Sequence, residues 1–191
     1  MTKPKMKYWW ILYQRLKQQM ENEILFSEKQ RFKQWWLWLF LLSINVFTLY
    51  GIFFQVIEGI QFGSNPMSNT GLIFTSAVIL LLTIFFGLCR LETQIKKDGI
   101  FVRFFPFHLT FRHYGWSTIS KSFVRQYRPI AEYGGWGLRG LGKDKALNVS
   151  GNKGLQLEFM NNKKLLIGTK KPRDITEILI RIGQNKPYQS F

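Results

Sequence analysis

Two uncharged apolar stretches decide the fold class: LWLFLLSINVFTLYGIFFQVI at Leu37–Ile57 and LIFTSAVILLLTIFFGLC at Leu72–Cys89. A helix needs about 20 apolar residues to cross the hydrocarbon core of a bilayer. In the first stretch, aromatic and aliphatic side chains surround the whole helix circumference, which is typical of a helix facing lipid. The sequence therefore predicts a two-helix transmembrane hairpin over residues 36–90, with a short external loop over residues 58–71.

The basic residues predict the orientation of this hairpin. The chain carries 27 Lys and Arg against 11 Asp and Glu, and its formal net charge is +16. None of the basic residues lies in residues 34–89. The positive-inside rule therefore places both termini in the cytoplasm. In a soluble protein this charge would favour nucleic acid as a partner. Here the topology accounts for it, so we expect anionic phospholipid headgroups of the bilayer as partner and no nucleic acid.

Residues 1–35 are predicted to form a cytoplasmic amphipathic helix. An apolar residue recurs every four positions, at Tyr8, Leu12, Leu16, Met20 and Ile24. Two interpretations remain open. Such a helix lies in the interface of the inner leaflet, or it packs with its apolar stripe against the cytoplasmic domain or a partner.

From Leu91 onward the apolar residues alternate with polar ones, which predicts strands. A turn signal, Lys97-Asp98-Gly99, separates the first two strands. The expected strands are LETQI, IFVRFF, FHLTFRHY, WSTIS, SFVRQYRPI, ALNVSG, GLQLEFM and KKLLIGT. The chain closes with a helix over about 172–183, because Pro172 suits a first helical turn and Ile175, Ile178, Leu179 and Ile182 share one face. The pattern predicts a small antiparallel β-barrel or sandwich capped by one helix.

This order of elements resembles the bacterial pleckstrin-homology-like (bPH) domain found in many two-helix membrane proteins. The stretches that carry the resemblance are Asp98-Gly99-Ile100 with Arg103-Phe104, Trp116 to Ile119, Glu132 to Arg139, and Ile167-Gly168-Thr169 leading to Pro172. The resemblance covers roughly residues 91–182 and extends to the preceding hairpin. It implies an α+β membrane protein of the bacterial inner membrane, with a PH-like domain over residues 91–191. It also implies a binding or assembly module rather than an enzyme.

The candidate binding residues fall into two groups. Eukaryotic PH-like domains often bind phosphoinositides through basic residues of the first hairpin, and Lys96, Lys97 and Arg103 occupy a similar place. The second group surrounds a glycine-rich segment, at Arg125, Arg128, Trp136, Arg139, Lys143 and Lys145. That segment lacks the Gly-Lys-Ser/Thr ending of a phosphate-binding P-loop. The candidates are therefore contacts for anionic headgroups or an acidic partner, or else a solvated strand edge that charge protects from aggregation.

The sequence favours no catalytic chemistry, metal or cofactor. The two histidines, His108 and His113, lack metal-ligand spacing on a strand, and no pair of acids or nucleophile with a base stands out. The single cysteine, Cys89, excludes an internal disulfide. It is a palmitoylation candidate or simply an apolar residue that ends a helix. We therefore expect a membrane-anchored PH-like binding or scaffold module that contacts anionic lipid or an unidentified protein. An accessory subunit of a membrane transport or envelope complex, a homo-oligomer and, most distantly, an enzyme are the alternatives.

Overall fold

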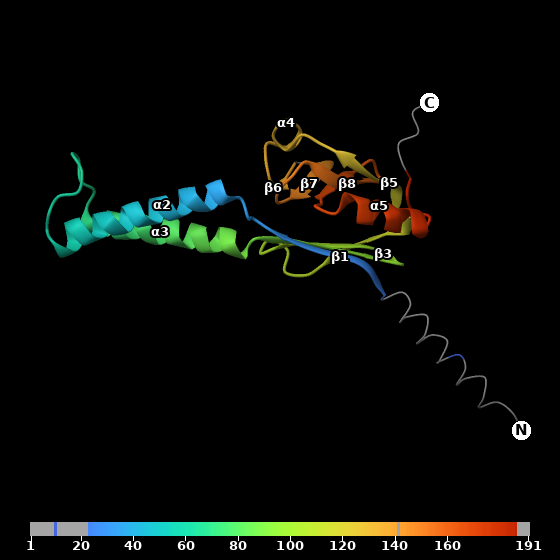
Figure 1. Cartoon of the computed structure of the whole chain (residues 1–191), viewed down its shortest axis with the longest axis horizontal. Coiled ribbons are helices and arrows are strands. Elements are labelled where there is room, and N and C mark those ends of the chain that lie inside the picture. The colour runs from blue at the N-terminus through green and yellow to red at the C-terminus, as the bar shows by residue number, and fades with distance from the viewer. Residues whose placement is uncertain (1–9, 11–22, 141, 187–191) are drawn as a thin grey trace, which may run out of the picture. The chain divides into compact units, whose positions relative to one another are not determined.

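The structure is a computed structural model that describes residue 10, residues 23–140 and residues 142–186. The chain divides into two compact units, shown in Figure 1. One unit is the helical hairpin Arg31–Cys89. The other combines the segment that ends at Gln30 with the chain from Arg90 onward, and it contains two β-sheets and the short helices. The class is α+β, as the sequence predicts.

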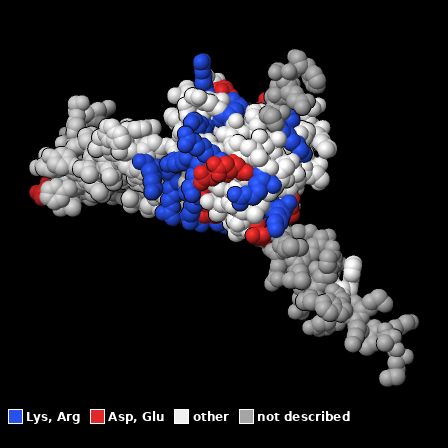
Figure 2. Space-filling view, turned by 45° about the vertical axis from the view of Figure 1, so that its right-hand side comes forward, with Lys and Arg blue, Asp and Glu red and all other residues white. Residues whose placement is uncertain are grey.

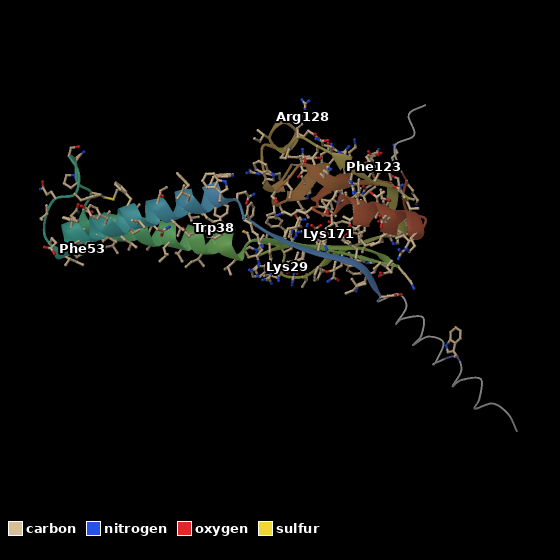
Figure 3. All side chains as sticks on the ribbon, in the orientation of Figure 1. Lys29, Trp38, Phe53, Phe123, Arg128 and Lys171 are labelled. Carbon is tan, nitrogen blue, oxygen red and sulfur yellow. The ribbon has the colours of Figure 1, made fainter. Side chains whose placement is uncertain are left out.

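The hairpin consists of two long helices joined by an irregular loop. Helix α2 spans Trp35–Ile52 and continues as one π-helical segment, η1, over Phe53–Ile57. Helix α3 spans Asn69–Leu88, and the Ser68 hydroxyl accepts a bond from the Gly71 amide at its start. In Figure 3, Trp38 marks the beginning of α2 and Phe53 its end.

Both helices are long and apolar enough to span a membrane, and their side chains are largely uncovered. Only 17% of the most apolar window of Trp35–Ile57 is buried, and only 11% of that of Asn69–Leu88. A core helix of a soluble protein buries most of its apolar side chains. The exposed apolar surface of this pair is therefore typical of helices that lipid surrounds.

Polar side chains join α2 to α3. Asn45 is buried and donates from Nδ2 to the Thr83 hydroxyl at 2.8 Å and to the Leu41 carbonyl at 2.7 Å. Thr48 and Ser76 are buried too and bond to carbonyls of their own helices. The described part of the hairpin contains no Asp, Glu, Lys, Arg or His between Lys33 and Glu58. Of these three side chains, Asn45 links the two helices.

The first sheet contains four strands in the order β1-β2-β3-β4. They span Ile24–Arg31, Arg90–Lys96, Gly99–Phe105 and Arg112–Gly115. Strand β3 pairs antiparallel with both β2 and β4. The side chains of Leu91, Ile95, Ile100, Val102 and Phe104 are fully or almost fully buried on one face of this sheet. Full burial of one such side chain stabilises the fold by roughly 1.5–3 kcal/mol.

The second sheet contains five strands in the order β5-β8-β9-β7-β6. They span Ile119–Gln126 (β5), Gly137–Arg139 (β6), Asp144–Asn148 (β7), Lys153–Phe159 (β8) and Lys164–Gly168 (β9). Strand β7 pairs parallel with β9, so the expectation of a purely antiparallel domain is wrong. Helix α5, Pro172–Arg181, buries Ile175 and Leu179 and contacts β5 and β8.

The N-terminal part of this unit corrects a prediction. Residues 24–31 form strand β1 and not the end of an amphipathic helix. Phe26, Glu28 and Gln30 are buried, whereas the residues between them are exposed. Glu28 accepts bonds from the Thr169 hydroxyl at 2.6 Å and the Lys170 amide at 2.9 Å. These partners lie far away in sequence, so a local pattern cannot reveal them. The predicted helix otherwise falls on residues 1–23, almost all of which lie outside the described residues.

Three further predictions fail locally. Phe107–Thr110 forms turns and not the first half of a strand, because the chain reverses at Phe105-Pro106 and β4 starts only at Arg112. Strand β5 ends at Gln126, and Pro129–Tyr133 forms the short helix α4. The Glu132 carboxylate accepts a bond from the Arg128 amide at 2.7 Å, which stabilises the first turn of α4. The predicted strand WSTIS is wrong over its first three residues, because Trp116–Thr118 forms a 3-10 turn, η2, and β5 starts only at Ile119.

Candidate functional site

A groove of about 560 Å³ lies between the edge strand β4 and the turn that joins β8 to β9. Its volume falls within the roughly 300–1,000 Å³ range of ligand sites. Five basic residues line it: Arg112, Lys143, Lys145, Lys163 and Lys164. Aromatic and apolar side chains, together with two hydroxyl residues, complete the lining: Tyr114, Phe159, Met160, Leu165, Ser117 and Thr118.

Strand register explains why Arg112 and Tyr114 face this groove. Arg112 lies opposite Val102 and Tyr114 opposite Ile100 in the antiparallel β3–β4 pair. Directly opposed residues project from the same face of a sheet, and Ile100 and Val102 belong to the buried face. On the edge strand β4, the residues on this face are Arg112 and Tyr114. The buried face of the sheet therefore ends in polar side chains that line the groove.

The β8–β9 turn holds the opposite wall in place. Asn162 has a positive φ of 60°, a backbone conformation that asparagine tolerates well. The Phe159 amide donates to the Lys163 carbonyl at 2.8 Å, and the Met160 amide donates to the Thr118 carbonyl at 3.2 Å. The groove wall is therefore bonded both within the turn and to η2.

The parallel β7–β9 pair brings the remaining lysines into the groove. Lys145 lies opposite Leu165 in this pair, and the Lys164 amide donates to the Lys143 carbonyl at 2.7 Å. The basic residues 143–145 and 163–164 thus lie at the starts of two parallel neighbouring strands, and so at the same edge of the sheet. An antiparallel pairing would separate the starts of these two strands.

The groove lining carries an excess of positive charge. It includes no Asp or Glu among the described residues. Lys164 forms an ion pair with Glu158 at 3.9 Å, and Glu158 also lies 3.4 Å from the Lys121 ammonium. Buried His108 responds to this charge: burial lowers the pKa of its imidazole, and the positive charges of Arg112 and Lys145 lower it further. A group of cations of this kind attracts phosphate or carboxylate.

Of the residues predicted from sequence, Lys143 and Lys145 line the groove, and the first-hairpin group lies elsewhere. The Lys96 ammonium lies 4.5 Å from the centre of the Phe101 ring, and Lys97 forms an ion pair with Glu23 at 2.8 Å. Arg103 bonds to Glu92 and lies over the Phe111 ring.

Glu92 holds a cluster of cations on the outer face of the first sheet. Its carboxylate forms ion pairs with Lys29, Arg90 and Arg103. Burial raises the pKa of Glu92, but hydrogen bonding and charge from Arg103, with help from Arg90 and Lys29, lower it overall. One carboxylate thus partly neutralises three basic side chains, and Arg103 is already engaged within the domain.

The glycine-rich group is likewise largely bonded internally. Arg125 donates to Glu132 at 2.8 Å and to Gln156 at 3.0 Å. Burial disfavours the Arg125 cation, but the hydrogen bond to Glu132 raises its pKa overall. The Trp136 indole donates to the Gly151 carbonyl, and Arg139 donates from Nε to the Trp136 carbonyl at 2.9 Å.

Arg128 differs from Arg125, because its side chain projects outward beside α4 (Figure 3). Figure 2 shows that Lys and Arg side chains gather on one region of the surface, next to a small acidic group. Basic residues are therefore abundant on this unit, and what distinguishes the groove is that its cations converge on a cavity.

Sequence reasoning missed Arg112, Lys163 and Lys164 as site residues. Arg112 belongs to a segment predicted to be a longer strand with Arg112 on its polar side. Lys163 and Lys164 follow a hairpin signal, which offers no hint of a cavity. The available signal was the recurrence of basic pairs just before two apolar strands, at residues 143–145 and 163–164.

The described residues contain no group of three or more His, Cys, Asp or Glu side chains placed to hold a metal ion. His108 accepts a bond at Nδ1 from the Phe104 amide at 3.4 Å. His113 stacks on Phe101 at a centroid distance of 4.4 Å and lies 3.5 Å from Asp98. The imidazoles therefore have separate structural surroundings.

In comparisons with known proteins, no family model matches this chain, and no curated protein or solved structure is significantly similar to it. The fold and the groove are therefore interpreted from their own chemistry.

Proposed function

We propose that this chain is a bacterial inner-membrane protein in which a PH-like domain binds anionic groups at the cytoplasmic surface of the bilayer. Two features support membrane insertion: the two apolar helices and their low burial. The basic residues on both sides of the hairpin, and their absence from residues 34–89, support cytoplasmic termini. The two facing sheets and the terminal helix α5 support a PH-like fold, although the parallel β7–β9 pair departs from the expected pattern.

The observation that carries the binding function is the groove with five cations and no carboxylate in its lining. Arg112 and Lys145 belong to strands of two different sheets. Beyond the effect of burial, the charges of both lower the pKa of the His108 imidazole. Charge-assisted hydrogen bonds from such groups to phosphate are short and strong. The cations of the groove repel one another in the folded domain. An anion that binds among them offsets this repulsion.

The test uses the full chain in nanodiscs of neutral phosphatidylcholine, with inorganic pyrophosphate as a soluble probe. The variant Lys145→Glu reverses a charge inside the groove. Lys153→Glu makes the same change at the start of β8, at the opposite end of that strand from Phe159. We expect Lys145→Glu to weaken pyrophosphate binding roughly tenfold and Lys153→Glu to leave it almost unchanged. Equal effects of the two variants on calorimetric titrations would contradict the proposal.

A second measurement reports on the groove directly. Because Arg112 and Lys145 lower the pKa of His108, pyrophosphate bound between them raises that pKa. Neither imidazole lines the groove, but His108 is buried near the charges of Arg112 and Lys145. His113 is exposed, stacks on Phe101 and lies near Asp98, so it is the internal control. NMR titration of the two imidazoles with and without pyrophosphate checks this result, and a rise shared equally by both indicates non-specific binding.

A further inference from the structure

The groove has an apolar wall that a small inorganic anion does not need. Met160 is 72% exposed and lines the groove beside Phe159. The Phe159 ring packs against Tyr114 with centroids 5.3 Å apart, and buried Leu165 completes this wall. An exposed methionine beside aromatic rings is an adaptable surface for apolar ligands. The lining thus combines cations with an uncovered apolar surface.

Resting on the proposed function, we propose that the groove takes up a single anionic phospholipid of the bilayer. The lysines and Arg112 hold the phosphate, and Met160, Phe159 and Leu165 contact the first carbons of an acyl chain. The apolar contact contributes because each buried methylene adds about 0.8 kcal/mol. The bonds of the β8–β9 turn to η2 give this wall its shape before the ligand arrives.

Tethering favours a bilayer lipid over a soluble amphiphile. Only Phe32–Gln34 separates β1 from α2, and only Cys89 separates α3 from β2. Once the two helices span a membrane, connections this short keep the domain among lipid headgroups at high effective concentration. An acidic peptide would satisfy the cations, but it would require a partner at comparable concentration.

The experiment uses the full chain in phosphatidylcholine nanodiscs that contain a small fraction of phosphatidic acid with a diazirine near the start of one acyl chain. Photolysis is expected to label the peptide that contains Phe159–Leu165. Met160→Asp lowers this label roughly tenfold, because it removes an apolar contact and adds a charge of the same sign as the ligand. Met160→Leu retains the label. Ile180→Asp, a matched change at an exposed residue of α5, leaves it unchanged.

The outcomes separate this inference from the proposed function. If pyrophosphate binds and Lys145→Glu weakens it, while Met160→Asp and Ile180→Asp give equal lipid labelling, only the phospholipid is excluded. If neither pyrophosphate nor lipid reaches the groove, both proposals fail. Soluble polyglutamate, added at an equal concentration of negative charge, tests the alternative ligand. If it displaces the lipid label, the groove binds an acidic protein partner and the phospholipid proposal is wrong.

Discussion

The pKa of the buried His108 imidazole depends on the charges around it. The imidazole is 8% exposed and accepts a backbone bond from Phe104, so the neutral form suits its environment. Burial, followed by the charges of Arg112 and Lys145, lowers its pKa in the folded protein. Two of the residues that lower the pKa of His108, Arg112 and Lys145, also line the groove.

The sign of this shift predicts how stability depends on pH. Since the folded-state pKa of His108 lies below its unfolded value of about 6.5, the unfolded chain binds the proton first as the pH falls. His108 therefore favours folding above about pH 6.5 and destabilises the protein progressively as the pH drops from there toward the lowered folded-state pKa.

Replacement of His108 by Asn is expected to flatten this part of the stability profile. Thermal unfolding of the full chain in detergent, measured from pH 7.5 to 5, checks the prediction. His113→Asn is the control, because His113 is exposed whereas His108 is buried. Identical slopes for wild type and His108→Asn would show that protonation of His108 does not cause this loss of stability at low pH.

At the scale of elements, the two membrane-type helices are joined by few polar contacts. The Asn45 amide donates to the Thr83 hydroxyl and so links α2 directly to α3, and the Gln55 amide of η1 donates to Asn69 Oδ1 at the start of α3. Ser43 lies on the exposed side and bonds to the Leu39 carbonyl of its own helix. Interhelical hydrogen bonds of this kind are worth about 1 kcal/mol in membranes.

We therefore expect Asn45→Leu to lower the free energy of unfolding of the hairpin by about 1 kcal/mol, while Ser43→Leu has little effect. Steric trapping or denaturation in mixed micelles provides the measurement. A loss in Ser43→Leu as large as that in Asn45→Leu would show that the helices associate through another face.

The elements differ in how well sequence alone predicts them. The helices around residues 37–57 and 72–89 and helix α5 carry complete local signals, and the structure contains all three. Strand β1 carries a misleading signal, because Glu28 and Gln30 are polar at buried positions. Their bonding partners near Gly168 belong to the other end of the chain. Of the groove residues, the sequence predicted only Lys143 and Lys145, since the parallel β7–β9 register that places Lys163 and Lys164 beside them is a non-local property.

At the scale of the whole chain, the hairpin is an insertion into one β-rich unit. Strand β1 precedes the hairpin and its neighbour β2 follows it. A fragment that starts at Arg90 lacks β1, leaves an unpaired edge on β2 and loses the bonds of Glu28 to Thr169 and Lys170. Unpaired edges promote aggregation.

This arrangement predicts different behaviour for two shortened forms of the chain. A chain in which a short Gly-Ser linker replaces residues 33–88 is expected to unfold cooperatively and remain monomeric. The fragment 90–186 is expected to be less stable, by roughly 2 kcal/mol or more for the lost Phe26 and Glu28 contacts, and to aggregate. Circular dichroism melts and light scattering compare the two, and equal stability would show that β1 is dispensable.

The insertion also sets an order of events during synthesis. Strand β1 leaves the ribosome first, yet its neighbour β2 is made only after both apolar helices, and Thr169 later still. Since domains fold as units when their parts become available, the four-stranded sheet closes only after the whole hairpin has been synthesised. The groove, assembled from β4 and from the turn after β8, is thus completed only after both apolar helices have been synthesised.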